Sequence, residues 1–282
     1  MTKTRFTQKI QSFPAPIRIG LFLILLVIFW LPVAIPVQLA FNDDPNLVTI
    51  LVMGWLFILF FILIKALGHQ VYQQEKPYQA IGLVLNLRNS KRLLLGLGIG
   101  LSLTFILFAL QSQLGWLNWQ ENALPFWRLI LEGALTGIGV AIAEESVFRG
   151  WLLNELERDY SLKIALWTNG MIFAISHFLK PIPVMLETLP AFPGLLLLGL
   201  ILVWARRRSK GELGLSIGLH GGLVWGYYIV DVGQLMTYTE TVSPAITGIY
   251  GNPIAGVMGW LFLLGLAAGL QPWKNESGGW SI

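Results

Sequence analysis

Long apolar segments recur along the whole chain and set the strongest limit on how it can fold. Each is long enough, or nearly so, to cross the ~30 Å hydrocarbon core of a bilayer as a helix. We therefore predict an all-α membrane protein, a polytopic bundle of about eight transmembrane helices. The predicted spans are residues 17–37, 47–67, 93–113, 126–153, 162–178, 189–204, 213–230 and 254–270.

The composition agrees with a membrane protein. Hydrophobic residues make up 55% of the chain and charged residues only 12%, whereas soluble domains carry roughly 25% charged residues. The mean hydropathy is +0.66. Cysteine is absent, which excludes disulfides, thiolate metal sites and a cysteine nucleophile.

The basic residues predict the orientation in the membrane. If the N-terminus is cytoplasmic, 17 of the 19 Lys and Arg residues fall on the cytoplasmic side, and only Arg128 and Lys180 fall outside. The positive-inside rule then places both termini in the cytoplasm. This asymmetry explains the net charge of +4 without nucleic acid, because the basic residues act as topology signals and as contacts for anionic lipids.

The order of the segments suggests a division into three parts. Residues 1–125 hold three spans, a basic leader and a polar segment, residues 69–91, predicted to lie along the cytoplasmic surface. Residues 126–230 hold the helices with buried polar residues. Residues 231–282 hold the last span and a short cytoplasmic tail.

Residues 141–150 carry three charges inside an apolar span: Glu144, Glu145 and Arg149. An ionised side chain at mid-bilayer costs at least ~2.5–3.5 kcal/mol, so such residues usually have a function. Glu145 and Arg149 are spaced i,i+4 and can pair on one helical face. Glu144 lies about 100° further round the helix and is left free for chemistry.

Histidine is rare, and two of the three histidines, His177 and His220, lie inside predicted spans. Glu144 and His177 are each about 16 residues from the polar turn at residues 158–161, or roughly 25 Å along a helix. If the two spans form a hairpin, they lie at equal depth and can face each other. A lone intramembrane histidine is also often a hydrogen-bonded packing residue, and that alternative stays open.

Two further patterns surround these histidines. Asn169, Phe173 and His177 recur every four residues and line one stripe of a helix. His220 lies among the small residues of segment 216–222. Small residues allow another backbone or a substrate to approach closely, or they simply allow tight helix packing.

These residues are suited to water-mediated acyl chemistry. A carboxylate and a histidine can hold and deprotonate a water, and a second imidazole can donate to the oxyanion. Neither Ser146 nor Ser176 has the surroundings of a nucleophile. Glu144, His177 and His220 could also bind zinc, but no HExxH motif is present and the three lie on different helices, so we expect no required cofactor.

Three motifs together resemble a known family of membrane proteins. They are Glu144-Glu145-x-x-x-Arg149, then Phe173-x-x-x-His177, and then His220 on a later span. In order and spacing they resemble the CAAX-protease and bacteriocin-processing membrane family (CPBP, also called Abi), over roughly residues 126–230. The eight-helix fold of this family agrees with the number of apolar segments.

The resemblance implies intramembrane hydrolysis of a bond in a peptide or membrane-protein substrate. Glu144 and His177 would activate the water, and His220 would help to stabilise the oxyanion. The remaining motif residues would have structural or supporting roles: Glu145, Arg149, Phe173 and Asn169. The family has been described both as metalloproteases and as metal-independent glutamate proteases, which leaves zinc open.

One position departs from the family pattern. The last histidine is usually followed four residues later by asparagine or a similar polar group, and here that residue is Val224. Losing one oxyanion donor typically lowers the rate by ~10²–10³. Trp225 or Tyr228, close by in sequence, could supply an indole or phenol donor instead.

Functions of three classes remain. The first is an intramembrane endopeptidase. The second is a catalytically weak or inactive relative that acts as a membrane-protein binding, assembly or immunity factor. The 12 tryptophans would supply anchors for a partner, although an interfacial aromatic belt is the favoured explanation of them. The third, a transporter with a buried proton relay, is less favoured because no inverted repeat is seen.

Overall fold

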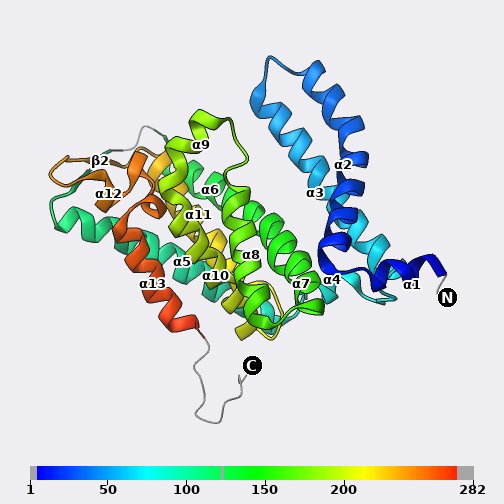
Figure 1. The fold of residues 1–282 in the computed structure, drawn as a ribbon. Coiled ribbons are helices and arrows are strands. Elements are labelled where there is room, and N and C mark those ends of the chain that lie inside the picture. Colours follow the sequence, from blue (N-terminus) through cyan, green and yellow to red (C-terminus); the bar gives the residue numbers. More distant parts are fainter. Residues whose placement is uncertain (1–4, 122–123, 272–282) are drawn as a thin grey trace, which may run out of the picture. The chain divides into compact units, whose positions relative to one another are not determined.

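The computed structural model describes residues 5–121 and 124–271, which are mostly helical (Figure 1). Lys3 and Lys274, which entered the charge count, and the tail from residue 272 lie outside the described residues. The elements are α1 (Arg5–Ser12), α2 (Ala15–Ala40), α3 (Pro45–Gln70), α4 (Pro77–Ala80), α5 (Leu87–Gln113), β1 (Leu117–Trp119), α6 (Phe126–Glu145), η1 (Ser146–Leu152), α7 (Leu153–Asp159), α8 (Leu162–Ser176), α9 (Ile182–Thr188), η2 (Leu189–Ala191), α10 (Phe192–Arg208), α11 (Gly214–Val232), β2 (Met236–Tyr238), α12 (Pro244–Thr247), η3 (Ile249–Gly251), η4 (Pro253–Ala255) and α13 (Val257–Leu270).

Each predicted span coincides with a helix, and the prediction of an all-α membrane protein is confirmed. Among the described residues, five helical segments are long and apolar enough to cross a membrane, by length and composition; α8 and α13 are apolar but shorter. The number of eight spans and the orientation stay predictions. The five segments are Ala15–Ala40, Pro45–Gln70, Leu87–Gln113, Phe126–Asp159 and Ile182–Arg208.

The seventh predicted span corresponds to α11, which is not one of the candidate spans found in the described residues. It packs against α5, α6 and α10, and all of its residues from Gly214 to Gly222 are buried. A helix enclosed by other helices need not be apolar, because its surroundings are protein rather than lipid. This position allows α11 to carry His220 and many glycines.

The described residues form two compact units. The first contains the described residues up to Ile81 together with Asn154–Ser161, and the second contains the described residues of Gly82–Leu153 and those from Leu162 onward. The three-part division predicted from the sequence, residues 1–125, 126–230 and 231–282, follows the order of the segments, and it stays a prediction. All of the predicted site residues belong to the second unit.

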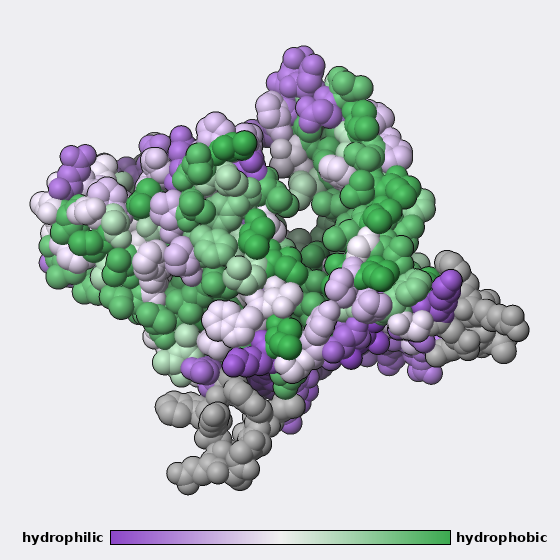
Figure 2. Space-filling view, viewed as in Figure 1, coloured by the Kyte–Doolittle hydropathy of each residue, from purple (hydrophilic) through white to green (hydrophobic). Residues whose placement is uncertain are grey.

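In the first unit, α2 and α3 form an antiparallel pair. The indole Nε1 of Trp30 donates to the carbonyl of Val52 at 3.1 Å, and the rings of Phe22 and Phe60 meet edge to face. Figure 2 shows apolar surface over these two helices and hydrophilic residues at the turn between them. Such a surface is suited to lipid acyl chains.

Ion pairs fasten α7 to the start of α2 in the same unit. Arg18 donates from Nε to Glu155 Oε2 at 2.7 Å and also pairs with Asp159. The Arg158 guanidinium lies 4.1 Å from the centre of the Tyr72 ring. These contacts hold α7, the helix that follows η1 in the chain, against the start of α2 and Tyr72.

In the second unit, α5 and α11 approach each other through glycines. Gly96 and Gly100 on α5 face Gly218 and Gly222 on α11, and a Cβ on any of the four would lie within 3 Å of backbone atoms of the other helix. Two small residues four positions apart on each helix let the backbones come this close. The seam fixes the position of α11, and therefore of His220.

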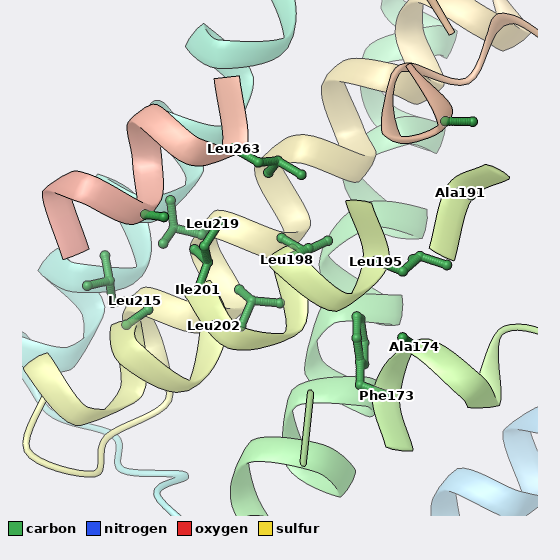
Figure 3. Close-up of a cluster of buried hydrophobic side chains, with 13 residues drawn as sticks. Phe173, Ala174, Ala191, Leu195, Leu198, Ile201, Leu202, Leu215, Leu219 and Leu263 are labelled. Carbon is green, nitrogen blue, oxygen red and sulfur yellow. The ribbon is translucent and has the colours of Figure 1, made fainter. Parts of the chain in front are cut away.

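A hydrophobic cluster joins α8, α10, α11 and α13 (Figure 3). Phe173 of α8 and Leu219 of α11 belong to it, and both are almost fully buried. The cluster therefore fixes the two helices from which the candidate site residues His177 and His220 extend.

A short antiparallel sheet was not part of the predicted fold. Strands β1 and β2 pair with Leu117 opposite Tyr238 and Trp119 opposite Met236, and Leu117 is buried against Phe108 and Val230. Strands of three residues are too short to give a clear two-residue periodicity in the sequence.

We predict that Gly96→Ala lowers the thermal stability of the protein in detergent, because its new methyl group meets the backbone of α11 at Leu215 and Leu219. Overpacking of this kind costs ~1–3 kcal/mol. The matched control is Gly98→Ala, two residues along the same helix, where nothing lies within 4 Å of an added Cβ. Equal unfolding temperatures for the two variants would contradict the close approach of α5 and α11.

Candidate active site

The charged segment lies where α6 changes its winding. α6 ends at Glu145, and residues Ser146–Leu152 form a π-helix, η1. Single stretches of π-helix inside α-helices are frequently found at functional sites. No feature of the sequence predicted this one. The Ser146 hydroxyl donates to the carbonyl of Ile142, so it is engaged within its own helix.

The predicted pair of Glu145 and Arg149 forms, and both side chains are fully buried. Arg149 Nη1 donates to Glu145 Oε1 at 3.0 Å, and Nη2 donates to the carbonyl of Gly199 in α10 at 3.1 Å. The guanidinium carbon also lies 4.1 Å from the centre of the Phe173 ring, a cation–π contact. One arginine thus connects η1 with α8 and α10.

His220 on α11 is held by the same carboxylate. Its Nδ1 lies 3.0 Å from Glu145 Oε1. A carboxylate paired with arginine can only accept a hydrogen bond, so Nδ1 carries the proton and donates it. The other ring nitrogen, Nε2, faces Glu144 Oε2 at 3.9 Å.

His177 lies in the turn that directly follows α8. The predicted span extends to residue 178, but α8 ends at Ser176, and Pro181 follows shortly after. The His177 Nδ1 lies 2.8 Å from the carbonyl of Phe173, so this nitrogen also carries its proton. Its Nε2 faces Glu144 Oε2 at 3.9 Å.

Glu144 is therefore the point at which the two histidines converge. Its Oε2 atom is buried and has no hydrogen-bond partner among the described residues, although buried polar atoms are nearly always partnered. The side chains of Glu144 and His177 are 30% and 31% exposed, and that of His220 only 5%. The site is thus open on the side of Glu144 and His177.

The predicted supporting residues divide into two roles. The Phe173 ring lies 4.7 Å from the His177 ring and 6.1 Å from the His220 ring, between centroids, so it packs against both imidazoles. Asn169 does not reach them: its Nδ2 donates to the carbonyl of Phe148 at 2.7 Å. Asn169 joins α8 to η1 instead.

The substitute donors suggested by the sequence are wrong. Trp225 Nε1 lies against Gly133 on α6, and the Tyr228 hydroxyl donates to Glu132 Oε2 at 3.1 Å. Gly133 is about 16 Å along α6 from Glu144, at 1.5 Å per residue. The reason is that α6 and α11 run antiparallel, so residues after His220 move away from Glu144.

A zinc site does not match this geometry. Among the described residues, no group of three or more His, Cys, Asp or Glu side chains is arranged to hold a metal ion. Tetrahedral zinc ligands at ~2.0–2.1 Å from the metal lie about 3.3 Å apart, whereas each Nε2 lies 3.9 Å from Glu144 Oε2.

Comparison with protein families gives one finding. Residues 125–226 match a family model described as type II CAAX prenyl endopeptidase Rce1-like. The matched region contains α6, η1, α8 and α10 and the part of α11 with His220, and it confirms the family resemblance predicted from the sequence. No curated protein and no solved structure matches the chain.

We predict that Arg149→Gln strongly destabilises the protein. The substitution leaves the Glu145 carboxylate buried without its cation, which typically costs ~3–5 kcal/mol. The matched control is Arg128→Gln, which breaks an i,i+4 pair with Glu132 whose side chains are 52% and 36% exposed. The unfolding temperature in detergent should fall strongly for Arg149→Gln and change little for Arg128→Gln. Similar decreases for both variants would contradict the conclusion that burial makes the Glu145–Arg149 pair more important than the exposed pair.

Proposed function

We propose that this protein is an intramembrane endopeptidase, because residues 125–226 match the family model described as type II CAAX prenyl endopeptidase Rce1-like. Its substrate would be a peptide or a membrane protein that reaches the site from the bilayer. The observation that supports this most is the position of Glu144 Oε2 between the Nε2 atoms of His177 and His220.

The hydrogen bonds fix where protons can be. Each histidine donates from Nδ1, to Phe173 O or to Glu145 Oε1, so a neutral ring presents the lone pair of Nε2 to Glu144. Glu144 Oε2 and a neutral Nε2 are both hydrogen-bond acceptors, so a donor must lie between them. A water that hydrogen-bonds to both atoms at ~2.8 Å, with an angle near 90°, would separate them by about 4 Å, which agrees with 3.9 Å.

In the proposed reaction Glu144 is the general base and His177 orients the water. Glu144 takes one proton as the water oxygen attacks the carbonyl carbon of the scissile peptide bond, and the carbonyl π electrons move to its oxygen. The protonated Glu144 then gives that proton to the amide nitrogen as the C–N bond breaks. The products are an amine and a carboxylic acid, and Glu144 is regenerated.

His220 is proposed to stabilise the tetrahedral intermediate. For this role His220 must enter the reaction as an imidazolium, with protons on both Nδ1 and Nε2, whereas His177 is neutral; Nε2–H of His220 then donates to the oxyanion. Glu145 holds the ring by its Nδ1, and Arg149 holds Glu145 through Nη1 and α10 through Gly199. Glu145 and Arg149 are therefore positioning residues, which act through His220 rather than on the substrate.

The proposal includes no metal step and no cofactor. It places both termini in the cytoplasm, as the positive-inside rule predicts. The spans are surrounded by lipid, in keeping with the exposed apolar side chains of both units.

We predict that Glu144→Gln lowers the cleavage rate by ~10²–10⁴, because the amide has nearly the same shape but cannot accept the proton. The measurement uses the purified full-length protein and a library of membrane-anchored peptides, with products identified by mass spectrometry. Glu187→Gln, at an exposed position on α9, is the matched control and should cleave as the wild type does. Cleavage should also persist in a chelator, and undiminished cleavage by Glu144→Gln would end the proposal.

Val224 favours a second candidate function. The position one helical turn after His220 offers no donor, and the neighbouring Trp225 and Tyr228 point to Gly133 and Glu132 instead. A site short of one oxyanion donor is suited to a catalytically weak or inactive relative, one that binds another membrane protein as an assembly or immunity factor.

The variant Val224→Asn distinguishes the two candidates. If the protein is an endopeptidase limited by this missing donor, kcat should rise by at least ~10-fold, because an oxyanion donor is worth up to ~10²–10³, while KM changes little. Val232→Asn, at the exposed end of α11, is the control and should leave kcat unchanged. The binding function is supported instead if no variant cleaves and one partner co-purifies equally with the wild type, Glu144→Gln and His177→Ala.

A further inference from the structure

A shallow, open hollow that the proposed reaction does not use lies along one face of the first turns of α5. Its volume is about 500 Å³, and its described lining consists of three basic and two apolar side chains. All are on one face of α5 near its N-terminus: Leu87, Arg88, Lys91, Arg92 and Leu95.

The length of α5 places these residues at the membrane surface. The helix has 27 residues, which extend about 40 Å, and the hydrocarbon core is ~30 Å thick. The apolar part, residues 93–113, is about 31 Å long and fills that core. Leu87–Arg92 must then lie at the depth of the lipid headgroups.

The hollow has a surplus of positive charge. Glu212 accepts from Arg88 Nη2 at 2.8 Å and from Arg92 Nη1 at 2.6 Å. The hydrogen bond from Arg88 is the main cause that holds the pKa of Glu212 below its usual range, so one negative charge faces three positive ones. Lys91 is exposed and makes no ion pair within the part of the chain that the structure describes.

We propose that this hollow binds the phosphate group of an anionic phospholipid. Lys91 and the exposed side of Arg88 would contact the phosphate oxygens, for which guanidinium and ammonium groups are suited. Leu94 and Leu95 are 66% and 58% exposed, and they would lie against the glycerol and the first acyl carbons.

The arrangement favours a lipid over a soluble phosphate. The cations are followed directly by outward-facing leucines on the same helix, so a ligand that is charged at one end and apolar at the other fits both parts. Basic clusters at the start of a membrane helix attract anionic lipids, at about 1 kcal/mol for each Lys or Arg near the surface. This proposal does not depend on the proposed endopeptidase activity.

The test measures lipid binding to the purified full-length protein in neutral detergent. Phosphatidylglycerol and phosphatidylcholine with identical acyl chains are titrated separately, and bound lipid is counted by native mass spectrometry. We expect preferential binding of phosphatidylglycerol, and about fivefold weaker binding of it to Lys91→Gln. Lys163→Gln, which removes an exposed lysine from α8, is the matched control and should bind as the wild type does.

Three outcomes would overturn the proposal. The first is equal affinity for the two lipids. The second is an equal loss in Lys91→Gln and Lys163→Gln, which would mean that only the overall charge attracts lipid. The third is displacement of phosphatidylglycerol by free glycerol 3-phosphate at similar concentration, which would mean a soluble phosphate ligand. An unchanged unfolding temperature of Lys91→Gln verifies that the variant is folded.

Discussion

The structure of the candidate site depends on one buried ion pair. Glu145 and Arg149 are both fully excluded from solvent, and in a low-dielectric interior each would be very unfavourable without the other. Their remaining hydrogen bonds extend to His220 and to the carbonyl of Gly199. Satisfying the pair therefore requires α6, α10 and α11 to take fixed positions, so the condition that keeps the charges stable also orients the imidazole.

Close backbone packing makes the buried position of His220 possible. α11 lies against α5 along a glycine seam at Gly96 and Gly218, and against α6 where Gly137 meets Gly221. Small residues on both sides enclose α11 in protein, so a helix with a histidine and an incomplete apolar face need not contact lipid. Membrane helices with the usual large side chains would hold α11 further from α6, and His220 further from Glu145.

The sequence allowed much of this arrangement to be predicted. Hydropathy predicted eight spans, and each of them contains a helix, although the short helices α1, α4, α9 and α12 were not predicted. Equal distance from a polar turn placed Glu144 opposite His177, because a helix rises by a constant amount per residue. The π-helix after Glu145 could not be predicted, since it depends on packing rather than on composition. The role suggested for Trp225 was wrong for a related reason. Trp225 is close to His220 in sequence, but α11 runs antiparallel to α6, so Trp225 lies further from Glu144 than His220 does.

The two adjacent glutamates differ in what surrounds them, and this separates their roles. Glu145 is fully buried, and its Oε1 atom pairs with Arg149 and His220, whereas the Glu144 side chain is 30% exposed and has no arginine partner among the described residues. A rotation of about 100° between successive residues turns one carboxylate into the protein and the other to the open side shared with His177. In the proposed reaction the substrate carbonyl approaches from this side, because Glu144 and His177 are partly exposed there whereas the His220 side chain is only 5% exposed. The neutralised pair then supports the structure, and in the proposed reaction Glu144, the carboxylate without an arginine partner, is the group available for proton transfer.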